Sequence, residues 1–386
     1  MRIGVITSEF PPINAAVSAR IEPWVKELSN RGNQVKVFSS KGSQATECTE
    51  HYASPLRVPS NKAGIFKRFF QEMRLAKDLG SRLRSVADDL DALVITSPPF
   101  FMATYIAKIA KKKNLPYLFD IRDRYPKVLF DLNVISEDGF IGRQLLRRES
   151  CCYQKSRLLT TVTHGIDQQL STFNRPHVHL PNGFDGGLFD PSKYTKKDEV
   201  FRIVYHGRFS RLHDIEALCK ISLTIQRLNP AIEFLIIGPV PESFQKKNWG
   251  NVRFAGEKKR DEIPALLASG SVGISLMKEM TSTRVAMPAK VYEYIGMGLP
   301  LVVAPSGELH DFVKVNKIGL AFKEMNILQI TDGIIALEKN RESFSRFHKN
   351  VFSIQSTFDR RKQAVYFADL IEKYFKTENA EKISLN

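Results

Sequence analysis

The sequence predicts an α/β protein made of two Rossmann-like, doubly wound parallel-sheet domains that face each other across a cleft. Short apolar segments of strand length alternate with helical segments along the chain, and this alternation implies parallel sheets with right-handed crossovers. A lysine- and acid-rich joint at 191–199 separates two such series. The length of 386 residues and the 43% apolar content are enough for two full cores.

We expect the first domain to span residues 1–190 and to open with a βαβ unit. Its strands cover 2–7 and 34–38, and the helix between them runs from about 16 to 30. The loop at 11–16 then lies at the carboxyl edge of the sheet, where ligands bind and where a helix N-terminus can face an anion. A plain connecting loop is the alternative.

The segment 61–90 interleaves basic and apolar residues, which predicts an amphipathic helix. Such a helix can bury its apolar stripe in the protein, which is the default, or lay that stripe on anionic lipid with its basic groups among the headgroups. Its charged and apolar positions include Lys67, Arg68, Arg74 and Lys77 beside Phe66, Phe69, Phe70 and Met73.

The remaining elements of the first domain continue the alternation. We expect one helix that ends near 113, a second that covers 140–155, and a short third helix that starts at His164. The predicted strands are 92–96, 117–119, 158–162 and 178–180.

Four charged residues follow the strand at 117–119. Two carboxylates and two guanidiniums at the end of a buried strand are costly unless they are paired or used. They either close the strand end as mutual Asp–Arg pairs or take part in a site. The four residues are Asp120, Arg122, Asp123 and Arg124.

We expect the second domain to span 200–355 and to repeat the same alternation. Its most informative stretch is 287–304, where a short helix carries Lys290 and Glu293 on one face, a Gly/Pro turn stops that helix, and an apolar strand follows. An amphipathic helix at about 358–376 is expected to pack back on the first domain. The other predicted strands are 201–205, 232–237, 252–254 and 272–276, with helices from about 213 and over 261–268.

The composition narrows the class of protein. Lys plus Arg exceed Asp plus Glu by 57 to 41, and the resulting charge of +16 favours a polyanionic partner. No short nucleic-acid signature is present, and no apolar run is long enough for a membrane span. The four scattered cysteines predict neither a disulfide framework nor a zinc site. We therefore expect a cytoplasmic protein without a signal peptide.

Several polar groups fall at predicted carboxyl ends of strands. The cations among them suit a diphosphate, because guanidinium and ammonium groups form charge-assisted hydrogen bonds to phosphate oxygens. A carboxylate nearby suits ribose hydroxyls. Neither a Walker loop nor a G-x-G-x-x-G motif is present, which argues against a P-loop ATPase and a dinucleotide dehydrogenase.

In their order and spacing, these motifs resemble the GT-B glycosyltransferases of family 4 over nearly the whole chain. The branch that transfers sugars in bacterial surface polysaccharide synthesis is the most similar. The matching pieces are MRIGVITSEFPP, FDIRDRYP, LPNGFD, YHGRFSRLHDIE, FLIIG and MPAKVYEYIGMGLPLVV.

The resemblance implies a retaining transferase that moves a sugar from a nucleotide-sugar, usually a UDP-sugar, to an acceptor hydroxyl without a metal or another cofactor. By position, it implies that Arg208 and Lys290 hold the diphosphate and that Glu293 binds the ribose. Asp123 is expected near the reacting sugar or the acceptor. Further donor-side residues would be Asn14, Ala15, Ala16, His213, Gly238 and Glu279, and further acceptor-side residues Arg122 and His164.

Three positions depart from the family pattern. The family's first carboxylate of E-x7-E falls on Val285, and Glu279 is the only near upstream substitute. The usual glycine pair of the first loop is replaced by Asn14-Ala15-Ala16. A lysine often found after the G-R turn is His213, which is charged only in part at neutral pH when its pKa is unperturbed.

The acceptor implied by this branch is a glycan or a polyprenyl-diphosphate-linked sugar. Docking on the anionic inner face of the cell membrane would then give the basic helix at 61–90 and the net charge a common cause. Alternatives are a nucleotide-sugar epimerase, a glycosyl phosphorylase, a nucleic-acid binder, and a non-catalytic GT-B scaffold that partners an active transferase. The missing carboxylate at Val285 favours the scaffold.

Overall fold

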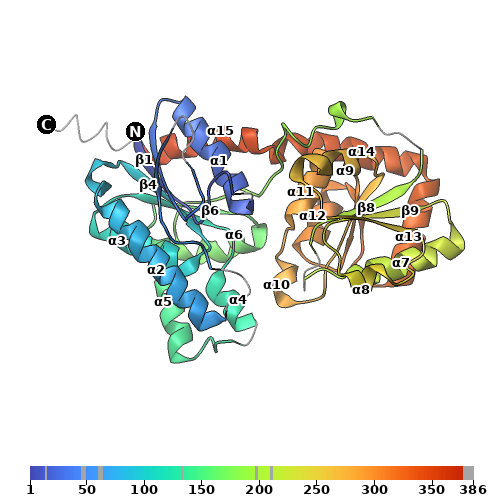
Figure 1. Cartoon of the computed structure of the whole chain (residues 1–386), viewed down its shortest axis with the longest axis horizontal. Coiled ribbons are helices and arrows are strands. Elements are labelled where there is room, and N and C mark those ends of the chain that lie inside the picture. The colour runs from blue at the N-terminus through green and yellow to red at the C-terminus, as the bar shows by residue number, and fades with distance from the viewer. Residues whose placement is uncertain are drawn as a thin grey trace. The chain divides into compact units, whose positions relative to one another are not determined.

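The computed structural model (Figure 1) describes residues 1–13, 15–44, 49–59, 64–131, 134–195, 199–208 and 212–376. The chain divides into two units. Unit 1 comprises Met1–Pro181 and the segment from Arg361 onward, and unit 2 comprises Asn182–Arg360. The sequence predicts the boundary at the charged joint 191–199. The division between the units falls about ten residues earlier in the chain.

Unit 1 contains a seven-stranded sheet of order β3-β2-β1-β4-β5-β6-β7, and every pair of neighbours is parallel. Parallel pairing throughout confirms the predicted α/β class. The strand β3 was not predicted. The strands are β1 (Arg2–Ile6), β2 (Gln34–Ser39), β3 (Thr49–Ala53), β4 (Ala92–Ser97), β5 (Tyr117–Ile121), β6 (Leu158–Thr161) and β7 (His177–His179).

Helices cover both faces of this sheet. One core packs α2, α3 and α5 against one face, and the other packs α1 and α15 against the opposite face. Trp24 of α1 stacks on Phe367 of α15 with ring centroids 3.9 Å apart, so the C-terminal helix belongs to unit 1 (Figure 1). The helices are α1 (Ala16–Asn30), α2 (Ile65–Arg84), α3 (Phe100–Lys112), α4 (Tyr125–Asp131), α5 (Phe140–Lys155), α6 (His164–Leu170) and α15 (Arg360–Phe375).

The predicted amphipathic helix at 61–90 forms α2 from Ile65 to Arg84. Leu75, Leu79 and Leu83 recur at helical spacing and are fully buried in the core of unit 1. The default interpretation, in which the stripe packs inside the protein, therefore holds for this part of the helix. Phe70, by contrast, is 64% exposed.

Unit 2 contains a six-stranded parallel sheet of order β10-β9-β8-β11-β12-β13. Its two cores lie on opposite faces, one with α9, α11, α12 and α14 and the other with α7 and α13. The strands are β8 (Arg202–His206), β9 (Glu233–Ile237), β10 (Val252–Gly256), β11 (Val272–Leu276), β12 (Leu301–Ala304) and β13 (Gly319–Ala321). The helices are α7 (Ile215–Leu228), α8 (Glu242–Gln245), α9 (Ile263–Ala268), α10 (Thr281–Arg284), α11 (Ala289–Gly296), α12 (Glu308–Asn316), α13 (Ile327–Lys339) and α14 (Arg341–Gln355).

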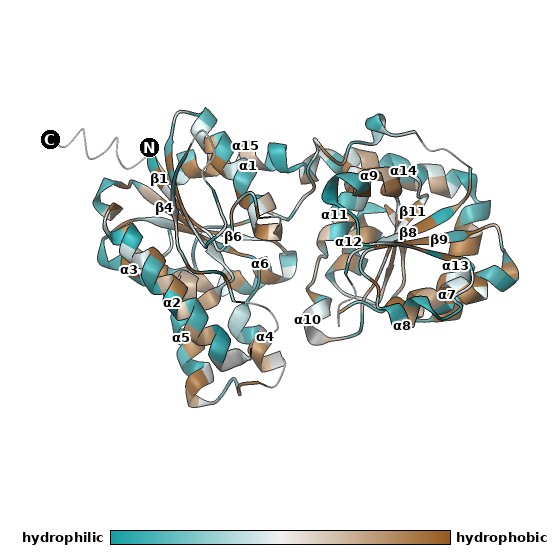
Figure 2. Ribbon diagram, in the orientation of Figure 1, coloured by the Kyte–Doolittle hydropathy of each residue, from teal (hydrophilic) through white to brown (hydrophobic). Residues whose placement is uncertain are grey.

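Hydropathy follows this layering within each unit. The strands are largely hydrophobic and the outward faces of the helices are hydrophilic (Figure 2). In unit 1, β4 and β5 are buried along their whole length, which is the pattern expected of a parallel sheet covered on both sides. Within the described part of the chain, no helix is both long and apolar enough to cross a membrane.

Candidate functional site

Two glycines hold the carboxyl edge of the unit 2 sheet open. Gly207 follows β8 and Gly238 follows β9, and their φ angles are +135° and +140°. A Cβ atom on Gly238 would lie 2.2 Å from the carbonyl oxygen of Gly207. Neither backbone could pass so close to the other with a side chain present, so a bare backbone surface forms where the two central strands end.

Lys290, in the first turn of α11, reaches this surface from the side. Its Nζ lies 3.9 Å from the centre of the Tyr205 ring and would be 3.0 Å from a Cβ on Gly207. The side chain is buried, and its Nζ has no hydrogen-bond partner among the described residues. Burial lowers the pKa of Lys290 from 10.5 to about 7, although Glu293 opposes the shift.

His213 also packs against Tyr205, edge to face, with the two ring centroids 6.1 Å apart. Burial and the nearby Lys290 lower its pKa to about 4, against a backbone hydrogen bond at Leu276. The expectation of a partly charged His213 is therefore wrong. The side chain is neutral near pH 7, so it offers a hydrogen-bonding ring nitrogen, and its Nδ1 has no partner in the described part of the chain.

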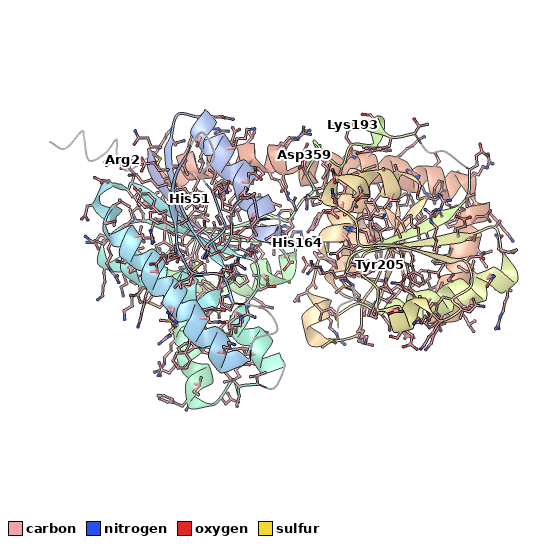
Figure 3. All side chains as sticks on the ribbon, viewed as in Figure 1. Arg2, His51, His164, Lys193, Tyr205 and Asp359 are labelled. Atoms are coloured by element: carbon pink, nitrogen blue, oxygen red, sulfur yellow. The ribbon has the colours of Figure 1, made fainter. Side chains whose placement is uncertain are left out.

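Glu293 lies one helical turn beyond Lys290 and is also buried. Its Oε2 is 3.0 Å from Nδ1 of His206, the last residue of β8. The backbone N–H of His206 donates to the hydroxyl of Tyr294, 2.8 Å away. Three residues within about one turn of α11, Lys290, Glu293 and Tyr294, therefore contact the end of β8. The predicted shared face of Lys290 and Glu293 lies against this strand end, which Tyr205 marks in Figure 3.

Arg208 and Glu279 are more exposed than the Lys290 cluster. Arg208 directly follows Gly207, and its backbone oxygen accepts a hydrogen bond from the Tyr205 hydroxyl at 3.3 Å. Glu279 follows β11 and lies 3.3 Å from the guanidinium of Arg284, with most of both side chains exposed. Val285 is 36% exposed at the end of α10, so an apolar side chain occupies the position of the family's first carboxylate.

The arrangement in unit 2 can bind an anion. A buried ammonium without a partner keeps its charge only at a cost in free energy, which its lowered pKa records. A phosphate group at Nζ would supply the missing opposite charge and hydrogen-bond acceptors. The glycines leave room for such a group next to the backbone.

The carboxyl edge of the unit 1 sheet collects a second set of polar groups. Ala15 is the extended N-cap residue of α1 and makes no side-chain hydrogen bond to that helix. Ala16 begins the helix and is exposed. The N-terminal N–H groups of α1 are therefore not capped by the N-cap side chain. Asn14 lies outside the described residues.

Of the four charged residues at the end of β5, two make their hydrogen bonds to residues outside this group. Asp120 is fully buried and accepts two hydrogen bonds from Arg20 of α1, at 2.9 and 3.2 Å. Arg124 donates to Glu149 of α5 at 3.1 Å. Asp120 and Arg124 are thus structural, and each has its hydrogen-bond partner on a helix elsewhere in unit 1, so the alternative of mutual Asp–Arg pairs does not account for these two residues.

Arg122 and Asp123 are the two of these four residues that remain candidates for a functional site. One guanidinium nitrogen of Arg122 donates to the Pro98 carbonyl at 2.7 Å, while its buried Nε has no partner among the described residues. The Asp123 side chain is exposed. Burial raises the pKa of Glu9, which follows β1, and the charge of Arg122 opposes that rise.

His164, labelled in Figure 3, is exposed at the start of α6 and packs against His179 of β7. The ring centroids of the two histidines are 3.8 Å apart. Burial, followed by the proximity of His164, lowers the pKa of His179 to about 4. His179 therefore supports His164 as a neutral ring.

Comparison with solved structures places this arrangement in a known fold. Sucrose-phosphate synthase from Thermosynechococcus elongatus superposes with a TM-score of 0.73 at 14% identity, covering 97% of this chain and 99% of that one. WaaG, a glycosyltransferase involved in lipopolysaccharide biosynthesis, gives 0.68 at 13% identity over 96% and 99%. Anabaena HepE in complex with UDP gives 0.67 at 13% identity over 97% and 100%. The chain has the GT-B fold.

Comparison of the sequence with protein families matches only part of this chain. Residues 189–353, which lie entirely in unit 2, match the family model for glycosyl transferases group 1. No curated protein matches the sequence significantly. The predicted fold class is confirmed, and unit 2 is similar to the group 1 glycosyltransferases.

The sequence analysis did not identify several residues that lie at the carboxyl edges of the two sheets. Tyr205 and His206 lie next to the G-R turn, and their position at the end of a predicted strand was a usable signal. Glu9 lies at the corresponding strand end in unit 1. Arg20 gave a different signal, since it is an arginine on the otherwise apolar face of α1. Among the described residues, no group of three or more His, Cys, Asp or Glu side chains could hold a metal ion.

Proposed function

We propose that this protein is a glycosyltransferase that takes its sugar from a nucleotide-sugar whose diphosphate binds at the carboxyl edge of unit 2. The observation that carries the proposal is the buried Nζ of Lys290, which has no partner among the described residues and faces a glycine-lined strand end. Arg208, which directly follows Gly207, adds an exposed guanidinium, and His213 adds a neutral ring nitrogen. These groups suit the oxygens of a diphosphate.

The proposed donor is a UDP-sugar. Support comes from the match of residues 189–353 to glycosyl transferases group 1 and from the similar Anabaena HepE, whose structures include complexes with UDP and with UDP-glucose. Glu293, buried one turn after Lys290, is the proposed ribose ligand, because a carboxylate accepts hydrogen bonds from vicinal hydroxyls. Gly238 gives the nucleotide close access to the backbone.

In the transfer step, the bond between the anomeric carbon and the diphosphate oxygen breaks and a bond to the acceptor oxygen forms. The acceptor hydroxyl passes its proton to an oxygen of the departing diphosphate, and UDP leaves. Negative charge grows on the departing diphosphate, so Lys290 and Arg208 stabilise the transition state more than the ground state. An oxyanion donor of this kind contributes about 3 kcal/mol. We propose Asp123 as the residue nearest the reacting centre on the unit 1 side.

We further propose that the sugar is transferred with retention, without a metal, to a glycan or a polyprenyl-diphosphate-linked sugar in surface polysaccharide synthesis. The support for this part is the motif resemblance and the similarity to WaaG. Arg122, with its unpartnered Nε, and the exposed His164 are the proposed acceptor contacts. We place the protein in the cytoplasm, at the inner face of the membrane.

One observation favours a second candidate, a non-catalytic GT-B scaffold that binds a nucleotide and partners an active transferase. The carboxylate expected at position 285 is absent, and the near substitute Glu279 pairs with Arg284 instead of facing the Lys290 cluster with a free carboxylate. A scaffold would keep the diphosphate contacts and lose those to the sugar.

Release of UDP from a panel of UDP-sugars, with a glycan acceptor mixture, separates the two candidates. The transferase predicts acceptor-dependent UDP release with at least one donor, and loss of that release in K290M. K314M, which changes an exposed lysine of unit 2, serves as the matched control and should behave as the wild type. UDP binding without turnover of any donor would contradict the transferase and favour the scaffold.

A further inference from the structure

Unit 1 contains a groove between α3 and α5 that the proposed reaction does not use. It encloses about 430 Å³ and is lined by both helices, by Met73 of α2 and by Tyr117 of β5. Its floor is mostly apolar and buried, and its rim is cationic and exposed. We call this feature the α3–α5 groove. Its floor includes Phe101, Ala107, Tyr117 and Cys152, and its rim carries Lys108, Lys111, Arg148 and Lys155.

The charge of the rim has one sign. Lys108 and Lys111 come from α3, and Arg148 and Lys155 from α5, so both walls of the groove carry cations. No Asp or Glu lines the groove, and within the described residues none of the four cations has an ion-pair partner. A ligand that fits must therefore combine an apolar body with an anionic group.

The surface of α5 extends this pattern beyond the groove. Ile141, Arg148 and Lys155 recur every seven residues, which is two helical turns, and so lie in one row along the helix. Ile141 is 60% exposed and its neighbour Phe140 is 74% exposed. The one acid of α5, Glu149, is buried against Arg124. The helix thus presents apolar groups at its start and only positive charge along its exposed face.

We infer that the α3–α5 face of unit 1 docks on an anionic phospholipid bilayer, with one acyl chain in the groove and lipid phosphates at its cationic rim. Phe140 and Ile141 insert among the neighbouring lipids, as exposed aromatic and aliphatic residues of interfacial helices do. A bilayer offers apolar chains and negative charge side by side along the whole row of Ile141, Arg148 and Lys155. An acidic protein helix would occupy only the groove. Each basic residue near such a surface adds to the attraction.

This inference gives the proposed lipid-linked acceptor a way to reach the protein, and in that respect it rests on the proposed function. It also relocates the membrane contact that the sequence suggests for 61–90. In α2, Leu75, Leu79 and Leu83 pack in the core of unit 1 and cannot contact lipid. The exposed apolar residues of α5, by contrast, do not pack in this core.

Vesicle sedimentation of the full chain tests the inference. The wild type should pellet with vesicles of phosphatidylglycerol and phosphatidylcholine and stay in solution with phosphatidylcholine alone. The groove variant K108Q/K111Q/R148Q/K155Q should lose at least tenfold in partition coefficient. The control K314Q/K323Q/K339Q/K349Q removes four exposed lysines from unit 2 and should lose much less. An equal loss in both variants would overturn the inference, because net charge alone would then explain binding.

The apolar part of the surface has its own matched pair. F140S/I141S should weaken binding several-fold. V315S/L328S removes residues that are 78% and 66% exposed in unit 2 and should leave binding unchanged. A bimane group on Cys151, the exposed cysteine of the groove, attached after replacement of Cys48 by Ser, should be quenched by lipids brominated on the acyl chain. Bound vesicles without quenching would contradict an acyl chain in the groove.

The two proposals fail separately. Loss of vesicle binding in the groove variant with normal UDP binding and UDP release supports the membrane inference and leaves the transferase intact. Vesicle binding by a wild-type chain that neither binds nor turns over a UDP-sugar would contradict the proposed function alone. If the wild type ignores anionic vesicles, the membrane inference is wrong, and an acidic helix of a protein partner becomes the better occupant.

Discussion

The ammonium nitrogen of Lys290 lies 3.9 Å from the centre of the Tyr205 ring. The ring face gives this buried cation a weak electrostatic partner, but no described residue gives its Nζ a hydrogen bond. The folded protein therefore keeps a charged group in an unfavourable place. Such an arrangement is expected at a site whose missing partner is a ligand.

Replacement of Lys290 by Met should stabilise the protein and abolish nucleotide binding. Burial lowers the pKa of Lys290 from 10.5 to about 7, so removal of the charge should raise the free energy of unfolding of unit 2 by on the order of 5 kcal/mol near pH 6. Urea unfolding of K290M measures this gain, and calorimetry with UDP should show at least a hundredfold weaker binding. A destabilised K290M would contradict the assignment of Lys290 as a strained site residue.

The stabilising effect of K290M should depend on pH. Between about pH 7 and 10.5 the unfolded chain keeps the Lys290 proton that the folded chain has lost, so the stability of the wild type rises with pH in that window. The advantage of K290M should therefore be full below pH 7 and shrink toward pH 10. A constant difference across the window would show that Lys290 titrates with an ordinary pKa.

Binding of UDP should take up a proton above pH 7. At about pH 8 most of the unliganded protein has a neutral Lys290, and a diphosphate favours its charged form. Affinity should fall by up to tenfold per pH unit as the pH rises. Calorimetry in two buffers with different ionisation enthalpies counts the protons directly. Equal enthalpies in the two buffers at about pH 8 would contradict the account.

The glycine at the end of β9 should be irreplaceable for steric reasons. A Cβ on Gly238 meets the Gly207 carbonyl at 2.2 Å, whereas one on Gly256, with φ +71°, meets nothing within 4 Å. G238A should therefore cost about 3 kcal/mol or more and G256A about 1 kcal/mol. In a W24F background Trp249 reports the unfolding of unit 2 alone. Equal costs would mean that only backbone strain matters at position 238.

The Arg20–Asp120 pair should behave as a buried structural pair. Arg20 also donates to the carbonyls of Leu180 and Pro181, at 2.8 and 3.0 Å, at the end of the first segment of unit 1. D120N alone should cost about 3 to 5 kcal/mol, because it leaves a buried guanidinium uncompensated. R20M/D120N should recover much of that loss. In a W249F background Trp24 fluorescence follows unit 1, and additive losses would exclude the pairing.

The stretch 287–304 shows how much of a site the sequence can predict. Its spacing gave the helix, the turn and the strand, and it placed Lys290 and Glu293 on one face. It could not show that both side chains are buried against the end of β8, because Tyr205 and His206 lie some 85 residues away in sequence. The pKa of His213 was mispredicted for the same reason, since its cause is burial next to Lys290.

The charged residues at the end of β5 show the limit more clearly. Their types and position predicted that they must be paired or used, and both outcomes occur. Asp120 and Arg124 take partners on α1 and α5, while Arg122 and Asp123 remain at the strand end. Only long-range contacts separate these roles, with Arg20 a hundred residues from Asp120. Two strands escaped prediction for different reasons: β3 (TEHYA) has little apolar pattern, and β13 has only three residues.

A crystal structure of the chain soaked with UDP tests the central claim most directly. The account predicts a diphosphate oxygen within hydrogen-bond distance of Lys290 Nζ, with Arg208 beside it and the ribose hydroxyls at Glu293. The diphosphate should also approach the backbone at Gly207 and Gly238. UDP bound elsewhere, or bound here with Lys290 still lacking a phosphate contact, would contradict the claim.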